Sequence, residues 1–142
     1  MLRAIDHVQI AIPPGGEEKA RSFYGDLLGL VEVPKPPTLA ARGGCWFESG
    51  SIKVHLGVEQ DFRANVKAHV AFEVDDVQVL ADLARTAGYA VKRDDEIADV
   101  ERAFVFDPFG NRLEFLKPME ASSPSPALPP VSGKGDARCP VR

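Results

Sequence analysis

The sequence predicts an α+β fold made of two tandem β-α-β-β-β modules. Two strand patterns are near copies of each other: residues 7–12 read HVQIAI and residues 69–74 read HVAFEV. Each copy is followed by one amphipathic helix pattern and then by three short strand patterns. A length of 142 residues suits one domain, or two small half-domains that pack tightly together.

The first module is expected over residues 1–58. In its first strand Val8, Ile10 and Ile12 share one face, because side chains alternate along a strand. A helix over residues 17–28 should place its apolar side chains on one stripe and end at Gly29. The remaining strands are predicted over residues 30–33, 44–48 and 52–58.

A polar connector over residues 59–67 leads to the second module, which is expected over residues 68–117. Its helix, over residues 77–87, should carry a core-facing stripe and stop at Gly88. The members of that stripe are Val77, Leu80, Ala81, Leu83 and Ala84. The later strands are predicted over residues 90–92, 102–106 and 112–116. The final segment, residues 118–142, is rich in Pro, Ser and Gly and is expected to be disordered.

The composition excludes several classes of function. A net charge of −4 provides no basic footprint for nucleic acid and no attraction to anionic membranes. Cys45 and Cys139 lie far apart and form no disulfide framework, which fits a reducing compartment. We expect neither a signal peptide nor a membrane span, and therefore a cytoplasmic protein.

The residues that carry chemistry recur at matching positions of the two modules. His7 and His69 open the first strands, and His55 and Glu114 lie on the last strands. Alternation places each of them opposite the larger apolar residues, on the open face of a sheet whose other face packs on helices. Three imidazoles and one carboxylate are a plausible ligand set for a divalent metal ion.

Plainer interpretations stay open for every one of these residues. Each histidine can be a half-exposed strand residue that binds nothing, and Glu114 can pair with Arg112. Gln9 and Phe104 are candidates for the substrate pocket but equally fit a solvated strand position and the core. Arg102 is a candidate for holding an anionic substrate, although such residues more often pair with surface carboxylates. Cys45 is expected to be a small buried residue rather than a nucleophile.

Several motifs resemble the vicinal oxygen chelate superfamily, which includes glyoxalase I, extradiol dioxygenases, and the fosfomycin- and bleomycin-resistance proteins. The resemblance covers about residues 5–117. It rests on residues 6–8 (DHV), 23–30 (FYGDLLGL), 68–72 (AHVAF) and 107–114 (DPFGNRLE). It implies that the two modules form a cup-shaped mixed sheet. It also implies metal ligands on the first and last strands of each module.

Carried over residue by residue, the resemblance implies ligands of Zn, Ni, Mn, Co or Fe at His7, His69 and Glu114, the set of the dioxygenase and fosfomycin branches. Adding His55 matches the four-ligand layout of glyoxalase I, and the sequence leaves open whether His55 is a ligand. It also implies a homodimer whose sites are shared between two chains. The chain departs from glyoxalase I, because Ala11 stands where an arginine that helps to bind glutathione is expected. It also lacks the serine-rich potassium loop of the fosfomycin branch and the four modules of the long dioxygenases.

The function predicted is that of a metal-dependent, glyoxalase-like enzyme of the isomerase or lyase type. The metal ion would chelate two oxygens of a small substrate, and Glu114 is the candidate base. One alternative is a metal-free protein that sequesters a small molecule, as bleomycin-resistance proteins do. Another alternative is a small extradiol-type dioxygenase, which a fourth ligand disfavours because oxygen chemistry needs an open position on the metal.

Overall fold

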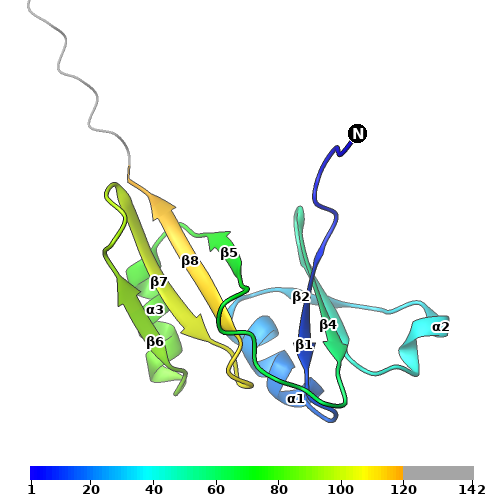
Figure 1. Ribbon diagram of the computed structural model, residues 1–142. Helices are drawn as coiled ribbons and strands as arrows, with labels where there is room; N and C mark the ends of the chain where they lie inside the picture. Colours follow the sequence, from blue (N-terminus) through cyan, green and yellow to red (C-terminus); the bar gives the residue numbers. More distant parts are fainter. Residues whose placement is uncertain (120–142) are drawn as a thin grey trace, which may run out of the picture.

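A computed structural model describes residues 1–119, so residues 120–142 of the predicted disordered segment lie outside the described part. The first module contains four strands and three helical segments (Figure 1). In chain order they are β1 (Val8–Ile12), α1 (Glu17–Ala20), η1 (Arg21–Leu27), β2 (Val31–Val33), α2 (Pro37–Ala40), β3 (Cys45–Ser49) and β4 (Ile52–Val58). The second module contains β5 (Val70–Glu73), α3 (Val77–Thr86), β6 (Val91–Asp94), β7 (Val100–Phe106) and β8 (Arg112–Pro118).

Each module forms its own mixed four-stranded sheet, and this confirms the predicted fold class. The strand orders are β1-β4-β3-β2 and β5-β8-β7-β6. In each sheet the first strand runs parallel to the last, and the other neighbours are antiparallel. Within residues 1–119 no strand of one sheet pairs with a strand of the other, so a single chain holds two sheets rather than one continuous cup.

The first helical segment supplies much of the core. Ala20, Phe23 and Tyr24 are fully buried, and they pack in one cluster with apolar residues of both sheets. The continuous helix predicted over residues 17–28 is instead a short α-helix followed by a π-helix, η1. Gly29 follows it with a φ of 72°, a left-handed conformation that glycine adopts without strain, and so ends the helix where expected.

The helix of the second module, α3, matches its predicted start. The Asp76 side chain accepts a hydrogen bond of 2.9 Å from the backbone N–H of Val79, which caps the helix. Val77, Ala81 and Ala84 are fully buried on the predicted stripe. Leu83 was predicted to lie on the core-facing stripe, and this was wrong, because its side chain is 53% exposed. Leu83 lies at the edge of the stripe, on the side of the helix that is turned away from the sheet.

A buried polar network holds the two modules together. The Tyr24 hydroxyl donates to Asp107 Oδ2 at 2.8 Å. Asn111 Nδ2 donates to the same oxygen and to the backbone carbonyl of Ala11 on β1, both at 2.9 Å. Asn111 Oδ1 accepts from the backbone N–H of Asn65 at 3.0 Å. The hairpin turn between β7 and β8 is therefore tied to β1, to η1 and to the connector.

The first module also contains an excursion that the sequence patterns did not predict. Residues 34–44 leave the sheet between β2 and β3 and include α2, which projects beside the first sheet in Figure 1. Pro36 and Pro37 begin α2, with Pro37 at a position where a missing N–H is tolerated. In the second module only residues 95–99 separate β6 from β7.

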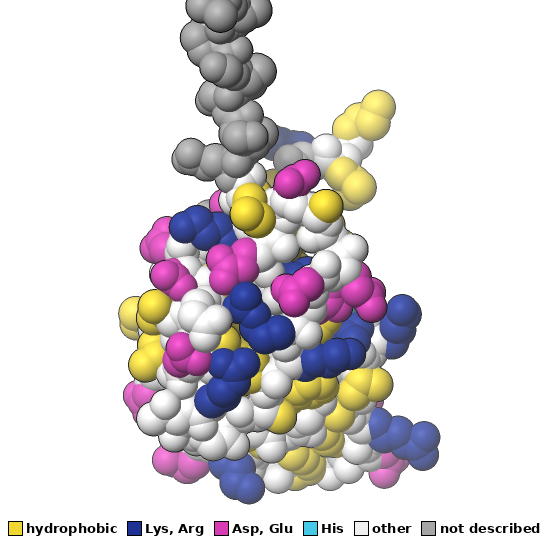
Figure 2. Space-filling view, turned by 90° about the vertical axis from the view of Figure 1, so that its left-hand side faces the viewer, with side chains coloured by type: hydrophobic (Ala, Val, Ile, Leu, Met, Phe, Trp, Pro, Cys, Tyr) yellow, Lys and Arg dark blue, Asp and Glu magenta, His cyan; other side chains and the backbone are white. Residues whose placement is uncertain are grey.

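Charges of both signs are mixed on the face of the second module that Figure 2 displays. Figure 2 shows Lys and Arg interspersed with Asp and Glu over the side of the molecule where this module lies. This mixture agrees with the absence of a basic footprint in the sequence. Among the described residues no helix is long and apolar enough to cross a membrane.

Candidate functional site

The open face of the first sheet carries a stack of three aromatic rings. The rings of His7 and His55 stack with centroids 4.1 Å apart, and those of Trp46 and His55 stack at 3.9 Å. The register of the sheet produces this stack, because Trp46 on β3 lies directly opposite His55 on β4. His55 is only 8% exposed. We call His7 and His55 the first half-site.

The two imidazoles of the first half-site differ in their hydrogen bonding and burial. His7 Nδ1 lies 2.9 Å from Asp6 Oδ2, an interaction that favours a proton on Nδ1 and leaves Nε2 unprotonated in the neutral ring. Neither ring nitrogen of His55 makes a hydrogen bond within residues 1–119. Burial, with a smaller effect of the neighbouring His7, lowers the pKa of His55 and favours its neutral form.

The open face of the second sheet carries a hydrogen-bonded ionic group instead. His69 Nε2 lies 2.8 Å from Glu114 Oε2. The Arg102 guanidinium donates to Glu114 Oε1 at 3.3 Å and to Asp94 Oδ1 at 2.7 Å. Glu114 is only 8% exposed. We call His69 and Glu114 the second half-site.

The surroundings of the second half-site fix the orientation of its side chains. His69 Nδ1 lies 2.9 Å from the backbone carbonyl of Lys67 and 3.3 Å from Arg112 Nη2, and these contacts hold the ring with Nε2 toward Glu114. The hydrogen bond to Asp94 raises the pKa of Arg102. The Phe104 ring is nearly buried and lies beneath the guanidinium groups of Arg102 and Arg112, 5.4 and 4.7 Å from its centroid.

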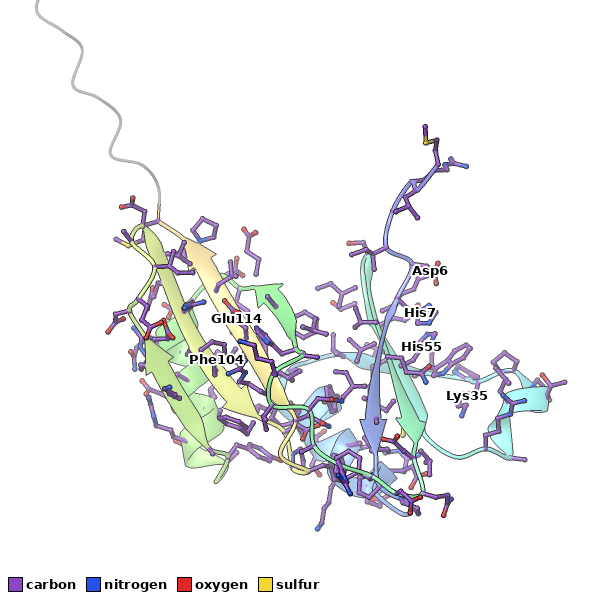
Figure 3. All side chains as sticks on the ribbon, viewed as in Figure 1. Asp6, His7, Lys35, His55, Phe104 and Glu114 are labelled. Atoms are coloured by element: carbon purple, nitrogen blue, oxygen red, sulfur yellow. The ribbon has the colours of Figure 1, made fainter. Side chains whose placement is uncertain are left out.

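The two half-sites do not meet within one chain. No group of three or more His, Cys, Asp or Glu side chains in residues 1–119 is placed to hold one metal ion. Figure 3 shows the reason: His7 and His55 point to the side of the first sheet where Lys35 lies, away from Glu114 and Phe104. The helix side of the first sheet packs against the second module through the shared core, so the open faces look in different directions.

The donor types of the two half-sites, imidazole nitrogen and carboxylate oxygen, are those that divalent metal ions bind. A proton between His69 Nε2 and Glu114 Oε2 occupies a place that a cation would take in a histidine–carboxylate pair. His7 and His69 each have Nδ1 beside an oxygen acceptor, which is the usual way in which a metal-binding imidazole is oriented. Each chain therefore offers two incomplete ligand pairs rather than one complete site.

Sequence reasoning missed several residues that shape these half-sites. Asp6 was detectable as the carboxylate that directly precedes His7. Trp46 was detectable from the predicted hairpin, because a turn at residues 49–51 sets Trp46 opposite His55. Asp94 gave no signal in the sequence, because its role depends on the pairing of β6 with β7. Gln9, on the same face as His7, is exposed and lines a cavity that adjoins Trp46.

Comparisons with known proteins agree with this architecture. A model of the Glyoxalase/Bleomycin resistance protein/Dioxygenase superfamily matches residues 4–115. The chain is similar to the crystal structure of a putative glyoxalase family protein from Bacillus anthracis. The two share 46% identity over 83% of this chain and 97% of that chain, with a TM-score of 0.79. A comparison with curated proteins found no match.

More distant solved structures share the fold. One is the fosfomycin resistance protein FosX from Listeria monocytogenes, with 11% identity, a TM-score of 0.71, and coverage of 84% of this chain and 94% of that chain. Another is TnmS3, an antibiotic binding protein from Streptomyces sp. CB03234, with 21% identity, a TM-score of 0.63, and coverage of 82% and 99%. Taken with the duplicated module and the family model, these findings place the chain in the Glyoxalase/Bleomycin resistance protein/Dioxygenase superfamily.

Proposed function

We propose that the protein is a metal-dependent, glyoxalase-like enzyme of the isomerase or lyase type that works as a homodimer. In this proposal His7 and His55 of one chain and His69 and Glu114 of the other hold one divalent ion. The observation that carries the proposal is the presence of two complementary ligand pairs, each on an open sheet face, that are kept apart within a chain. A two-fold symmetric dimer would contain two equivalent sites of four ligands each.

When bound, the metal ion would polarise two oxygens of a chelated substrate and stabilise developing negative charge. Glu114 is the residue proposed to accept the proton from the substrate. Its carboxylate is nearly buried, and Arg102 holds it at Oε1, a contact that a metal ion between Oε2 and His69 Nε2 would leave in place. Such positioning lets a base act without first reorganising its surroundings.

The aromatic stack would keep His55 neutral and shielded from water. Trp46 covers one face of His55, and His7 covers the other. Because the pKa of His55 is lowered, its ring stays unprotonated at neutral pH, as a ligand must be. A fourth ligand would occupy a position that dioxygen requires, which favours isomerase or lyase chemistry over dioxygenase chemistry. The wide spacing of the cysteines supports work in a reducing compartment.

Metal analysis of protein purified without a histidine tag, together with its mass in solution, tests the proposal. We expect a dimer with close to one divalent ion per chain, and near-complete loss of the ion in His7→Ala and in Glu114→Ala. Glu101→Ala is a matched control, because Glu101 pairs with Arg93 and lies on neither half-site. Bound nickel, zinc, cobalt or manganese supports isomerase or lyase chemistry, whereas bound iron supports the dioxygenase alternative.

The rival function is metal-free sequestration of a small molecule. It is favoured by the absence, in residues 1–119 of a single chain, of any cluster of three metal ligands. It predicts that the wild type stays empty after incubation with excess divalent ions. It also predicts that His69→Ala still binds the ligand. A wild type that stays empty would overturn the metalloenzyme proposal, whereas ligand binding retained in His69→Ala would show only that the small molecule binds without His69.

A further inference from the structure

The excursion between β2 and β3 forms one wall of a cavity on the open face of the first sheet. The cavity has a volume of about 280 Å³. Its lining includes Gln9, Lys35, Leu39, Arg42, Trp46 and Gly57. Trp46 belongs both to this lining and to the stack on His55, so the cavity adjoins the first half-site. Figure 3 shows Lys35 on the same side of the sheet as His7 and His55.

Two cationic side chains of the excursion line this cavity. Within residues 1–119 no carboxylate oxygen lies within 4.0 Å of the charged nitrogens of Lys35 or Arg42. The Lys35 ammonium donates one hydrogen bond to the backbone carbonyl of Gly43. An ammonium has three donors, so two remain for a ligand, and the Arg42 guanidinium adds a planar fork that suits carboxylate and phosphate.

The carboxylate of Glu17 lies behind this wall and already accepts a hydrogen bond from the backbone. Glu17 Oε1 accepts a hydrogen bond of 2.9 Å from the backbone N–H of Gly44. That bond, with a smaller contribution from Lys35, lowers the pKa of Glu17 and keeps its side chain ionised. Glu17 therefore holds the end of the excursion in place. The Glu17 carboxylate offsets part of the positive charge of Lys35. It leaves all hydrogen-bond donors of the Arg42 guanidinium available to a ligand.

The floor of the cavity is shaped for a polar group. A Cβ atom at Gly57 would lie 2.7 Å from Gln9 Nε2 and would displace the end of that flexible side chain from its present place. Glycine at this place on β4 therefore allows the Gln9 amide to lie across the strand and line the cavity. Trp46 and Leu39 supply the apolar part of the lining. The cavity thus combines two cations, one amide and an aromatic surface.

We propose that this cavity binds the anionic group of the substrate, a carboxylate or a phosphate monoester, whose apolar body lies against Trp46 and Leu39. As a substrate subsite it rests on the function proposed above, although anion binding itself does not require the metal ion. The substrate class is then a small organic anion with an apolar or aromatic body. Its chelating oxygens would extend toward His7 and His55.

Trp46 is the only tryptophan of the chain, so its fluorescence reports directly on this cavity. We would titrate chelator-treated full-length protein with benzoate, phenyl phosphate and the neutral benzamide while recording that fluorescence. An anion held by charge-assisted hydrogen bonds should bind about tenfold more tightly than the amide of similar shape. Lys35→Met and Arg42→Gln should each remove most of this preference, and Lys35→Arg should retain it.

Two variants outside the cavity serve as controls for lost positive charge. Lys19→Met on α1 and Arg85→Gln on α3 should leave the preference unchanged, because neither residue lines the cavity. Tighter binding of benzoate than of phenyl phosphate would assign the subsite to carboxylates, and the reverse order would assign it to phosphates. Equal binding of anions and benzamide would overturn the inference, as would a preference that survives loss of both cations.

The result is independent of the metal test. Anion binding in a protein that never takes up metal would keep this inference and reject the proposed enzyme. A protein that binds metal but shows no preference for anions would keep the proposed enzyme and reject this inference.

Discussion

The two modules share one strand topology but carry different kinds of chemistry on their open faces. In the first sheet, His55 lies between the rings of His7 and Trp46, and burial keeps it neutral. At the matching place of the second sheet, Glu114 is hydrogen-bonded by His69 and Arg102. Phe104 is the counterpart of Trp46, since Trp46 lies opposite His55 and Phe104 lies opposite Glu114 on the neighbouring strand.

This difference shows that the duplicated backbone sets positions, whereas a few side chains decide what each position does. The first half-site holds two imidazoles, and the second holds a carboxylate with a hydrogen-bonded histidine. Neither pair alone satisfies the ligand number that a divalent ion usually takes from protein. The candidate ligand pairs of the two modules are therefore complementary in type.

The helices differ most in how much core they contribute. Phe23→Ala on η1 removes a fully buried ring and should lower the free energy of unfolding by about 4 kcal/mol. Leu83→Ala on α3 should change it by less than about 0.5 kcal/mol, because that side chain is mostly exposed. Urea denaturation of both variants measures the contrast. Equal losses would contradict the described core.

The hairpin turns before the last strands should also differ. Asn111→Ala leaves the carbonyl of Ala11 and the N–H of Asn65 without their partner and should cost about 3 kcal/mol. Ser51→Ala, in the corresponding turn of the first module, removes an exposed side chain and should cost less than about 0.5 kcal/mol. Thermal unfolding of both variants provides the measurement, and a stable Asn111→Ala protein would refute the role of this network.

The aromatic stack distinguishes the open faces themselves. Trp46→Leu should cost about 1 kcal/mol from the lost ring stacking beyond the loss of buried area. It should also bring the pKa of His55 closer to its ordinary value, because the ring becomes more exposed to water. Proton NMR of the three histidines against pH would show the change. An unchanged His55 titration would mean that Trp46 does not shield it.

The smallest expected effect is a dependence of stability on pH. Because folding lowers the pKa of His55 from 6.5, the unfolded chain binds the proton first as the pH falls. The contribution of His55 is fully present above pH 6.5, is lost as the pH falls below that value, and stops changing below the folded pKa. The difference in melting temperature between the wild type and His55→Gln should therefore become smaller as the pH is lowered through this range.

The sequence predicted the elements well because its alternation and turn residues are strong local signals. The bounds of β4 agree with the prediction at both ends, and α3 starts at the predicted Val77. The π-helical geometry of η1 was not predictable from three-to-four-residue spacing, which both helix types accommodate. The short α2 has no buried residues and therefore left no hydrophobic pattern.

The predicted site residues illustrate a different limit. Alternation along strands predicts the open face for His7 and Glu114, because it depends only on neighbouring residues. Which open faces meet depends on how the modules pack, and that is decided by Phe23, Tyr24 and the network around Asn111. Contacts of this kind join residues far apart in the chain, and no local pattern reports them.

A hybrid dimer tests most directly whether two chains complete one site. One chain would carry His7→Ala and His55→Ala, and the other His69→Ala and Glu114→Ala, with different histidine-free tags for purification of the mixed pair. The hybrid contains one intact four-ligand site, so it should bind about half the metal of the wild-type dimer, whereas either variant paired with itself should bind almost none. A hybrid that stays empty while the wild type loads fully would contradict the shared site.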